Sequence, residues 1–341
     1  MISFSSDYIE GCAPEILARF AETNLVQQTG YGADIWCESA KARIREAVGK
    51  PEAEVFFICG GTQTNMITID AMLKSFEGVV SVTSGHINGH EAGAVEATGH
   101  KILQLPEHDG LMDAGELKKM LADYFGDHSI EHLVKPGMVY ISYPTEFGTL
   151  YSKQQLRELA AVCHEYGLPL FADGARLGYG LASKACDLTL KEFADIVDVF
   201  YIGGTKVGAL CGEALVFSGI PAPEQFFTQI KRRGGIMAKG RVVGIQFDEL
   251  FKDGLYMRLS EHCMEMAELL KKTFVEKGYE LLVDSPTNQQ FVIMDRAKAE
   301  ELSKEVVFSH WSNVDEKRAA YRFVTSWATP KENIEKLGEL L

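Results

Sequence analysis

The chain of 341 residues has no surplus of basic residues, no long apolar run and no paired cysteine motif. Its net charge of −14 argues against nucleic acid or an anionic membrane as a partner, because both need basic protein surface. No apolar run reaches the length of a membrane span, and the start MISFSSDYIE lacks the features of a signal peptide. The seven cysteines are scattered and odd in number, which indicates reduced thiols rather than a disulfide framework or a zinc site. We therefore expect a cytoplasmic protein.

Short apolar runs alternate with amphipathic helical stretches over most of the chain. VFFIC (55–59) and MVYIS (138–142) are apolar throughout, which is typical of strands buried on both faces. Ser152-x-x-Gln155 has the form of a capping box at the start of a helix. The alternation predicts βαβ units, and therefore an α/β fold with a mostly parallel sheet between two layers of helices. Further strands are expected near 78–82, 101–105, 168–172 and 197–202, and helices near 14–28, 35–48 and 88–97.

The last part of the chain has a different pattern. A long helical stretch runs from about 223 to 277 with a break near Asp253-Gly254, and shorter strands and helices follow it. We therefore expect two domains. Residues 1–245 would form an N-terminal segment and a large domain, and residues 246–341 a smaller C-terminal α/β domain.

A single lysine, Lys206, follows the apolar run VDVFYI (197–202) after the small residues Gly203-Gly204-Thr205. Ligands of open parallel sheets gather at the carboxyl ends of strands, so this position suits chemistry. Burial there would lower the pKa of the amine and free it to attack a carbonyl group. A surface lysine between two strands would have the same local sequence. The residues at the other predicted strand ends are therefore needed to distinguish a reactive lysine from a surface lysine.

Three other predicted strand ends carry candidate ligand-binding residues. Gly60-Gly61-Thr62 opens a helix and could hold a phosphate on its N–H groups, although a plain tight turn also fits. Asp173 could balance a protonated ring nitrogen, cap a helix or pair with Arg176. His86 could stack on a flat ring, act as a base or be an ordinary loop histidine. No histidines have the HExxH spacing of a metal site, so no metal is expected.

Together these residues meet the requirements of a pyridoxal 5'-phosphate site. The cofactor needs a lysine to form an imine, a carboxylate to keep its ring nitrogen protonated and a cradle for its phosphate. Lys206, Asp173 and Gly61-Thr62 supply these groups, and His86 supplies a ring for the cofactor face. Pyridoxal phosphate is therefore the cofactor that the sequence predicts.

The chain resembles the threonine aldolase / aromatic amino acid β-eliminating lyase family, pyridoxal phosphate enzymes of fold type I, the aspartate aminotransferase fold. The resemblance covers nearly the full length. DGARL (173–177) is its most specific signature, and Thr205-Lys206 fits the family's Ser/Thr-Lys pair. Further matches are FSSD (4–7), Tyr31-Gly32 with Asp34, Gly61-Thr62 with Asn65, His86 with Glu91, and the segment YRFVTSWAT that contains Arg322.

The resemblance implies a role for each matching residue. Lys206 would be the Schiff-base lysine, Asp173 the partner of the ring nitrogen, and His86 the stacking ring and candidate base. Arginines would bind the substrate carboxylate, because such pairs are bidentate and geometrically selective. The cofactor would contact Gly61, Thr62, His86, Asp173, Arg176, Thr205 and Lys206, and the substrate would contact Ser6, Tyr31, Arg176 and Arg322.

The implied activity is that of an aldolase, a carbon–carbon lyase. It would cleave a β-hydroxy-α-amino acid of the threonine, allo-threonine or phenylserine type to glycine and an aldehyde. β-Elimination or transamination of another amino acid uses the same cofactor and stays open, as does a cofactor-binding protein without turnover. The active site of this fold usually lies at a subunit interface, so a homo-oligomer, a dimer or a dimer of dimers, is expected.

Two departures from the family pattern bear on the substrate side chain more than on the cofactor. Ile35-Trp36 stands where many threonine aldolases have proline and threonine. The family's Gly-Gly-Gly-Met-Arg segment reads GGIMAKGR (234–241) here, so its arginine is displaced, with Lys239 or Arg241 as candidate replacements. GGIMAKGR and the Gly-Gly-Thr-Lys context (203–206) resemble the phenylserine-aldolase-like branch more closely.

Overall fold

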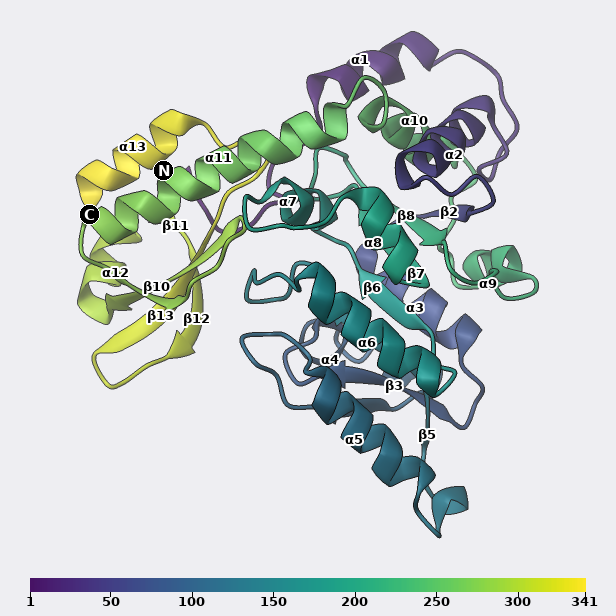
Figure 1. The fold of residues 1–341 in the computed structure, drawn as a ribbon. Coiled ribbons are helices and arrows are strands. Elements are labelled where there is room, and N and C mark those ends of the chain that lie inside the picture. The colour runs from purple at the N-terminus through teal and green to yellow at the C-terminus, as the bar shows by residue number, and fades with distance from the viewer.

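The computed structural model describes all residues, 1–341, and contains a large sheet, a smaller C-terminal sheet and helices packed on both (Figure 1). In spatial order the strands of the large sheet are β2 (Glu54–Ile58), β8 (Glu213–Phe217), β7 (Val199–Gly203), β6 (Leu170–Asp173), β5 (Lys135–Ser142), β3 (Glu77–Val82) and β4 (Ile102–Leu105). β8 is antiparallel to both of its neighbours, and all the other strands run in one direction. The carboxyl ends of these other strands therefore share one edge, which confirms the mostly parallel sheet.

Helices cover both faces of the large sheet, as the sequence pattern predicts. Val139 and Ile141 point into one core, whereas Met138 and Tyr140 point into the other, because successive side chains of a strand alternate. Both faces are buried, which explains why the strand sequences are apolar throughout. The first face carries α2 (Ile35–Val48), α5 (Ala114–Phe125), α6 (Lys153–Glu165), α8 (Leu190–Ile196) and α10 (Arg241–Leu250), and the second α3 (Gly61–Met72), α4 (His86–Gly89) and α9 (Phe226–Arg232).

The long helix α11 (Leu255–Glu276) connects the two sheets (Figure 1). It packs against α7 (Leu177–Ala182) beside the large sheet and against α13 (Lys331–Leu340) at the C-terminal end. α1 (Pro14–Thr23) packs on α10. None of the helices combines the length and the apolar character needed to cross a membrane.

The C-terminal sheet has four antiparallel strands, and the start of the chain packs beside it in a separate two-stranded parallel sheet. β1 (Ile2–Ser3) pairs with β11 (Val306–Val307), and Phe4 lies in the C-terminal hydrophobic core. The division between residues 245 and 246 stays a prediction. In spatial order the strands are β12 (Ser309–Asn313), β13 (Arg318–Val324), β10 (Gln289–Asp295) and β9 (Glu280–Val283), and α12 (Arg296–Leu302) follows β10.

The helix and strand predictions hold with four differences. The long helical stretch expected from about 223 to 277 is interrupted at 233–240 as well as near Asp253-Gly254, so it forms α9, α10 and α11. The helix from Pro14 ends at Thr23 instead of continuing to residue 28, because Arg241 binds the carbonyl oxygens of the loop after it. The stretch 88–97 forms α4 and a short 3₁₀ turn rather than one helix, since Ala92 and Gly93 adopt φ values of 51° and 75°. α7 has no counterpart in the sequence prediction. The capping box of α6 is present, with the Gln155 N–H 3.2 Å from Ser152 Oγ.

Two glycines fix the distance between the loops that follow β6 and β7. A Cβ atom at Gly203 would collide with the carbonyl oxygen of Ala175, and one at Gly174 with the carbonyl oxygen of Tyr201. The neighbouring backbones can approach this closely only where no side chain intervenes. The loop that carries Asp173 and the loop that carries Lys206 are thus held against each other.

We expect Gly203→Ala to lower the free energy of unfolding by about 1–3 kcal/mol, because the methyl group meets backbone atoms that cannot rotate away. Gly11→Ala is the matched control, since a Cβ there has nothing within 4 Å. Denaturant unfolding of both variants tests this. Equal stability of the two would contradict the close contact.

Candidate active site

A cavity of about 490 Å³ lies where the carboxyl ends of the parallel strands face the C-terminal sheet. The large sheet contributes mainly charged groups, and the C-terminal sheet contributes an aromatic wall. In that wall the Trp311 ring packs on Phe291 and Phe147, with centroid distances of 4.8 and 5.7 Å. The lining residues are Tyr8, His86, His90, Glu146, Arg176, Lys206, Ser309, His310, Trp311 and Arg322.

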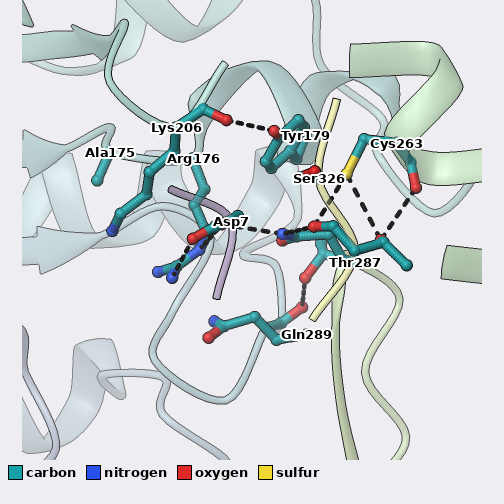
Figure 2. Close-up of polar contacts among 12 residues, drawn as sticks. Asp7, Ala175, Arg176, Tyr179, Lys206, Cys263, Thr287, Gln289 and Ser326 are labelled. Atoms are coloured by element: carbon teal, nitrogen blue, oxygen red, sulfur yellow. Dashed lines mark hydrogen bonds and ion pairs between the residues drawn. The ribbon is translucent and has the colours of Figure 1, made fainter. Parts of the chain in front are cut away.

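Lys206 reaches this cavity from the loop after β7. Its backbone carbonyl accepts a hydrogen bond from the Tyr179 hydroxyl, which fixes the lysine backbone (Figure 2). Its Nζ lies 6.0 Å from the centroid of the Tyr8 ring. No carboxylate pairs with Nζ, so the amine is not committed to a salt bridge. The surface-lysine alternative does not fit this position.

Asp173 ends β6 and is buried among hydrogen-bond donors. Oδ1 accepts from the Tyr201 hydroxyl (2.5 Å) and the Ala175 N–H (3.0 Å). Oδ2 accepts from the Tyr140 hydroxyl (2.7 Å) and the Asn65 amide (2.8 Å). Burial alone would favour the neutral acid, but His86 and these donors outweigh burial and hold the pKa of Asp173 below its ordinary value. Asp173 is therefore an ionised carboxylate at neutral pH.

His86 is joined to Asp173 through a chain of hydrogen bonds. Its Nδ1 lies 2.8 Å from Glu91 Oε1, and the same oxygen accepts from the Asn65 amide at 2.7 Å. Burial disfavours the imidazolium, but the hydrogen bond to Glu91 and the charges of Glu146 and Asp173 raise the pKa of His86 above its ordinary value. Because Nδ1 is tied to Glu91, the other ring nitrogen remains for a ligand.

Two arginines also line the cavity, Arg176 buried and Arg322 half-buried. Arg176 makes a two-point ion pair with Asp7, with Nε–Oδ2 2.6 Å and Nη2–Oδ1 3.1 Å (Figure 2). Arg322 donates from Nη1 to Gln289 at 3.2 Å, and its buried Nε has no partner. Burial and the charge of Arg176 lower the pKa of Arg322. The remaining donors of these arginines suit a carboxylate.

Six of the predicted site residues lie outside the cavity lining: Ser6, Tyr31, Gly61, Thr62, Asp173 and Thr205. Gly61 and Thr62 open α3, Ser6 is buried with an unpartnered hydroxyl, and Tyr31 lies on an exposed loop beneath Lys231. The hydroxyl of Thr205 donates to Glu213 Oε1 at 2.8 Å. Arg241 binds the carbonyl oxygens of Thr23 and Val26, and Lys239 lines a separate cavity beside the same loop, so neither of these candidates lines the site cavity. Their predicted ligand contacts stay predictions.

The comparisons with known proteins agree with this geometry. A family model described as β-eliminating lyase matches residues 3–297. The chain belongs to the β-eliminating lyase family. It is 40% identical to the structure of a threonine aldolase from Leishmania major, with a TM-score of 0.96 and coverage of 100% of this chain and 98% of that one. A low specificity L-threonine aldolase from Pseudomonas aeruginosa is 29% identical, over 98% of this chain and 95% of the relative.

The fold prediction is confirmed as well. An aromatic aminotransferase from Pyrococcus horikoshii superposes with a TM-score of 0.71 at 18% identity, covering 99% of this chain and 94% of that one, which supports the aminotransferase fold alone. Family membership also confirms the predicted cofactor, because β-eliminating lyases and threonine aldolases depend on pyridoxal phosphate.

The residues of this family member fit the cofactor. Asp173 is held ionised, as partnering a protonated ring nitrogen requires, although the ring N–H would have to displace one of its four donors. Asn65 is the donor that can turn away, because it keeps Glu91 as a second partner. The first turn of α3 leaves N–H groups without intrahelical partners, as a phosphate cradle needs.

Several residues of the site are not singled out by the sequence. Asp7 and Tyr201 act as partners of Arg176 and Asp173, and each comes from a distant part of the chain. Tyr140 and Tyr201 each stand two residues before a strand end on the same face, a signal visible in the strand sequences. Glu213 and Trp311 carry no local motif.

We expect Asp7→Asn to destabilise the protein by about 3–5 kcal/mol, because Arg176 would keep a buried charge without a partner. The pKa of Asp7 is lowered, since Arg176 outweighs the effect of burial. The difference between wild type and variant should therefore be full near neutrality and shrink as the pH falls through the pKa of folded Asp7.

Glu268→Gln is the matched control, because the Lys184–Glu268 pair is exposed. It should change the free energy of unfolding by less than about 0.5 kcal/mol. Denaturant unfolding at several pH values measures both variants. An Asp7→Asn protein as stable as the control would show that the pair is unimportant.

Proposed function

We propose that the protein is a pyridoxal phosphate-dependent aldolase that cleaves β-hydroxy-α-amino acids of the threonine, allo-threonine or phenylserine type to glycine and an aldehyde. It is thus a carbon–carbon lyase. One observation carries this proposal. A lysine, a histidine and two arginines line one cavity, and an ionised aspartate is joined to the histidine through hydrogen bonds of Asn65 and Glu91, in a chain 40% identical over its full length to a threonine aldolase structure.

Each charged side chain of the site has a distinct task. When bound, pyridoxal phosphate supplies an electron sink for the electron pair released at Cα. Lys206 offers the amine for covalent attachment, and Asp173 keeps the ring nitrogen protonated. Arg176 and Arg322 bind the substrate carboxylate, which relieves the repulsion between the two guanidinium groups and sets the direction of the Cα–Cβ bond.

His86 is the residue proposed to take the proton of the β-hydroxyl group. The Glu91 carboxylate fixes the ring by accepting a hydrogen bond from the Nδ1–H of His86, so the other ring nitrogen can receive a proton. The hydrogen-bonded oxygens of Glu91 and Asp173 stabilise the positive charge that His86 then gains. Stacking on the cofactor is compatible with this role.

The protein is further proposed to be a cytoplasmic homo-oligomer, a dimer or a homotetramer. In support of an oligomer, the loop between α1 and α2 exposes the apolar side chains of Leu25, Val26 and Tyr31, and Ile35 at the start of α2 is exposed beside it. Such a patch on one loop is typical of a protein–protein interface. Tyr31 would then contribute to the cavity of a neighbouring subunit.

The central test is product analysis with purified protein. We expect a yellow protein that releases glycine from threonine or phenylserine, and we expect Lys206→Ala to lose both this activity and the borohydride-reducible link to the cofactor. Lys272→Ala, at an exposed position of α11, is the control and should behave as wild type. Ammonia and a keto acid in place of glycine would indicate β-elimination instead. A retained link in Lys206→Ala would refute the assignment.

The proposed base predicts a pH dependence. Because the pKa of His86 is raised above 6.5, kcat/KM should fall as the pH drops through a value above 6.5 and protonates the imidazole. His86→Phe keeps an aromatic ring but no base, so kcat should drop by about 10²–10⁴-fold and the fall of kcat/KM at low pH should vanish. If the variant still shows this fall, another group causes it.

A further inference from the structure

Glu213 is a buried acid that the proposed reaction does not use. It is 3% exposed and is the first residue of β8, the strand between β2 and β7. Its backbone pairs with Ile58 of β2 and Gly203 of β7. Those strands lead directly to Gly60-Gly61 and to Lys206, so Glu213 lies between the proposed phosphate cradle and the lysine loop.

The carboxyl group of Glu213 contacts the two residues before Lys206. Oε2 accepts the N–H of Gly204 at 3.0 Å, and Oε1 accepts the hydroxyl of Thr205 at 2.8 Å. The Thr205 oxygen also accepts the N–H of Gly212 at 3.1 Å. A hydroxyl has a single hydrogen, so Thr205 cannot donate to a phosphate while it donates to Glu213.

Protonation of Glu213 would reverse this hydrogen bond. The acid O–H could then donate to the remaining lone pair of the Thr205 oxygen, and the Thr205 hydrogen would be free for a ligand. The second carboxyl oxygen could still accept from Gly204. Protonation therefore changes the donor pattern of the Lys206 loop without moving its backbone.

The surroundings of Glu213 favour the neutral acid. Burial raises the pKa of Glu213 to about 8, and the charge of Asp173 acts in the same direction, against the hydrogen bonds from Thr205 and Gly204 and the charge of Lys206. The other titratable groups near it are Tyr201, Tyr256 and Cys211, which all stay neutral because their own pKa values are raised. No lysine or arginine forms a salt bridge with Glu213.

We propose that Glu213 couples a proton to phosphate binding: its protonated form releases the Thr205 hydroxyl to the phosphate of the cofactor, and its ionised form withdraws that donor and repels the phosphate. This rests on the proposed cofactor site, in which Gly61, Thr62 and Thr205 hold the phosphate. Binding of the phosphate dianion then keeps one proton on Glu213, taken from solution where Glu213 is ionised. No covalent bond is formed or broken.

The probe is pyridoxine 5'-phosphate, which carries the phosphate but no aldehyde and so cannot attach to Lys206. Its phosphate stays a dianion above about pH 7, so phosphate titration does not interfere, and titration of its ring nitrogen affects wild type and the glutamate variants alike. Calorimetry from about pH 7 to about pH 9.5 should give a wild-type Kd that rises by up to about tenfold per pH unit above the pKa of Glu213. In buffers of different ionisation enthalpy, binding in that range should take up protons.

Glu213→Gln is the decisive variant, because a glutamine amide imitates the protonated acid. Its oxygen can accept from Gly204 and its NH₂ can donate to Thr205 at every pH. Its Kd should rise less steeply with pH than that of wild type, and its binding should take up fewer protons, because only the ring nitrogen of the probe still titrates. Thr205→Val should bind weakly throughout. Glu77→Gln, a buried glutamate at the start of β3, is the matched control and should keep the wild-type pH dependence.

The outcomes separate this proposal from the proposed function. Equal pH dependence in wild type and Glu213→Gln would overturn the role of Glu213 while leaving the cofactor site intact. Failure of wild type to bind the probe at any pH would contradict the cofactor site itself, and with it this proposal. A less steep rise of Kd with pH in Glu213→Gln alone among the glutamate variants would establish the coupling.

Discussion

The ion pair between Asp7 and Arg176 is the interaction on which the geometry of the site depends. Asp7 belongs to the N-terminal segment, Arg176 to the loop after β6, and Asn288, which donates to Asp7 at 2.9 Å, to the C-terminal part. Three regions that are far apart in the sequence therefore meet at one carboxylate. The pair also uses one edge of the Arg176 guanidinium and so decides which donors remain for a substrate. A buried pair of this kind gives little net stability, but removal of one partner is costly, so it specifies the arrangement more than it strengthens it.

The charges at the cavity are balanced by different means. Asp173 stays ionised because four donors and His86 compensate for its burial. Glu91 has only the His86 ring and one amide as partners, and burial raises its pKa. Glu213 has two neutral donors and a raised pKa. The pKa values of these carboxyl groups follow the number and charge of their hydrogen-bond partners. Hydrogen bonding rather than depth of burial therefore decides which carboxyl group remains charged.

The sequence predicts most of the fold because each βαβ unit is a local pattern. The apolar strands, the capping box at Ser152 and the end of α2 at Gly49 all depend on nearby residues. The strand order and the reversal of β8 could not be predicted, since they depend on pairing between distant segments. The same limit applies to the site. Lys206, Asp173 and His86 are visible as strand-end residues. Asp7, the partner of Arg176, and Tyr201, the partner of Asp173, become apparent as partners only when the fold brings them together. Within one chain, Tyr31 lies away from the cavity. It could contact a substrate only in the cavity of a second subunit.

A protein of net charge −14 that binds a phosphorylated cofactor must create local positive potential in an acidic molecule. The N-terminus of α3 and Lys206 supply it from two neighbouring strand ends. An ionised carboxylate between those strand ends would cancel much of this potential, because buried charges are poorly screened. Evolution could have placed an apolar residue at position 213. A carboxyl group that is neutral when the phosphate is present costs little electrostatically and supplies a hydrogen-bond donor that an apolar residue lacks. The position of Glu213 is thus consistent with a binding role only if the residue is protonated when it acts.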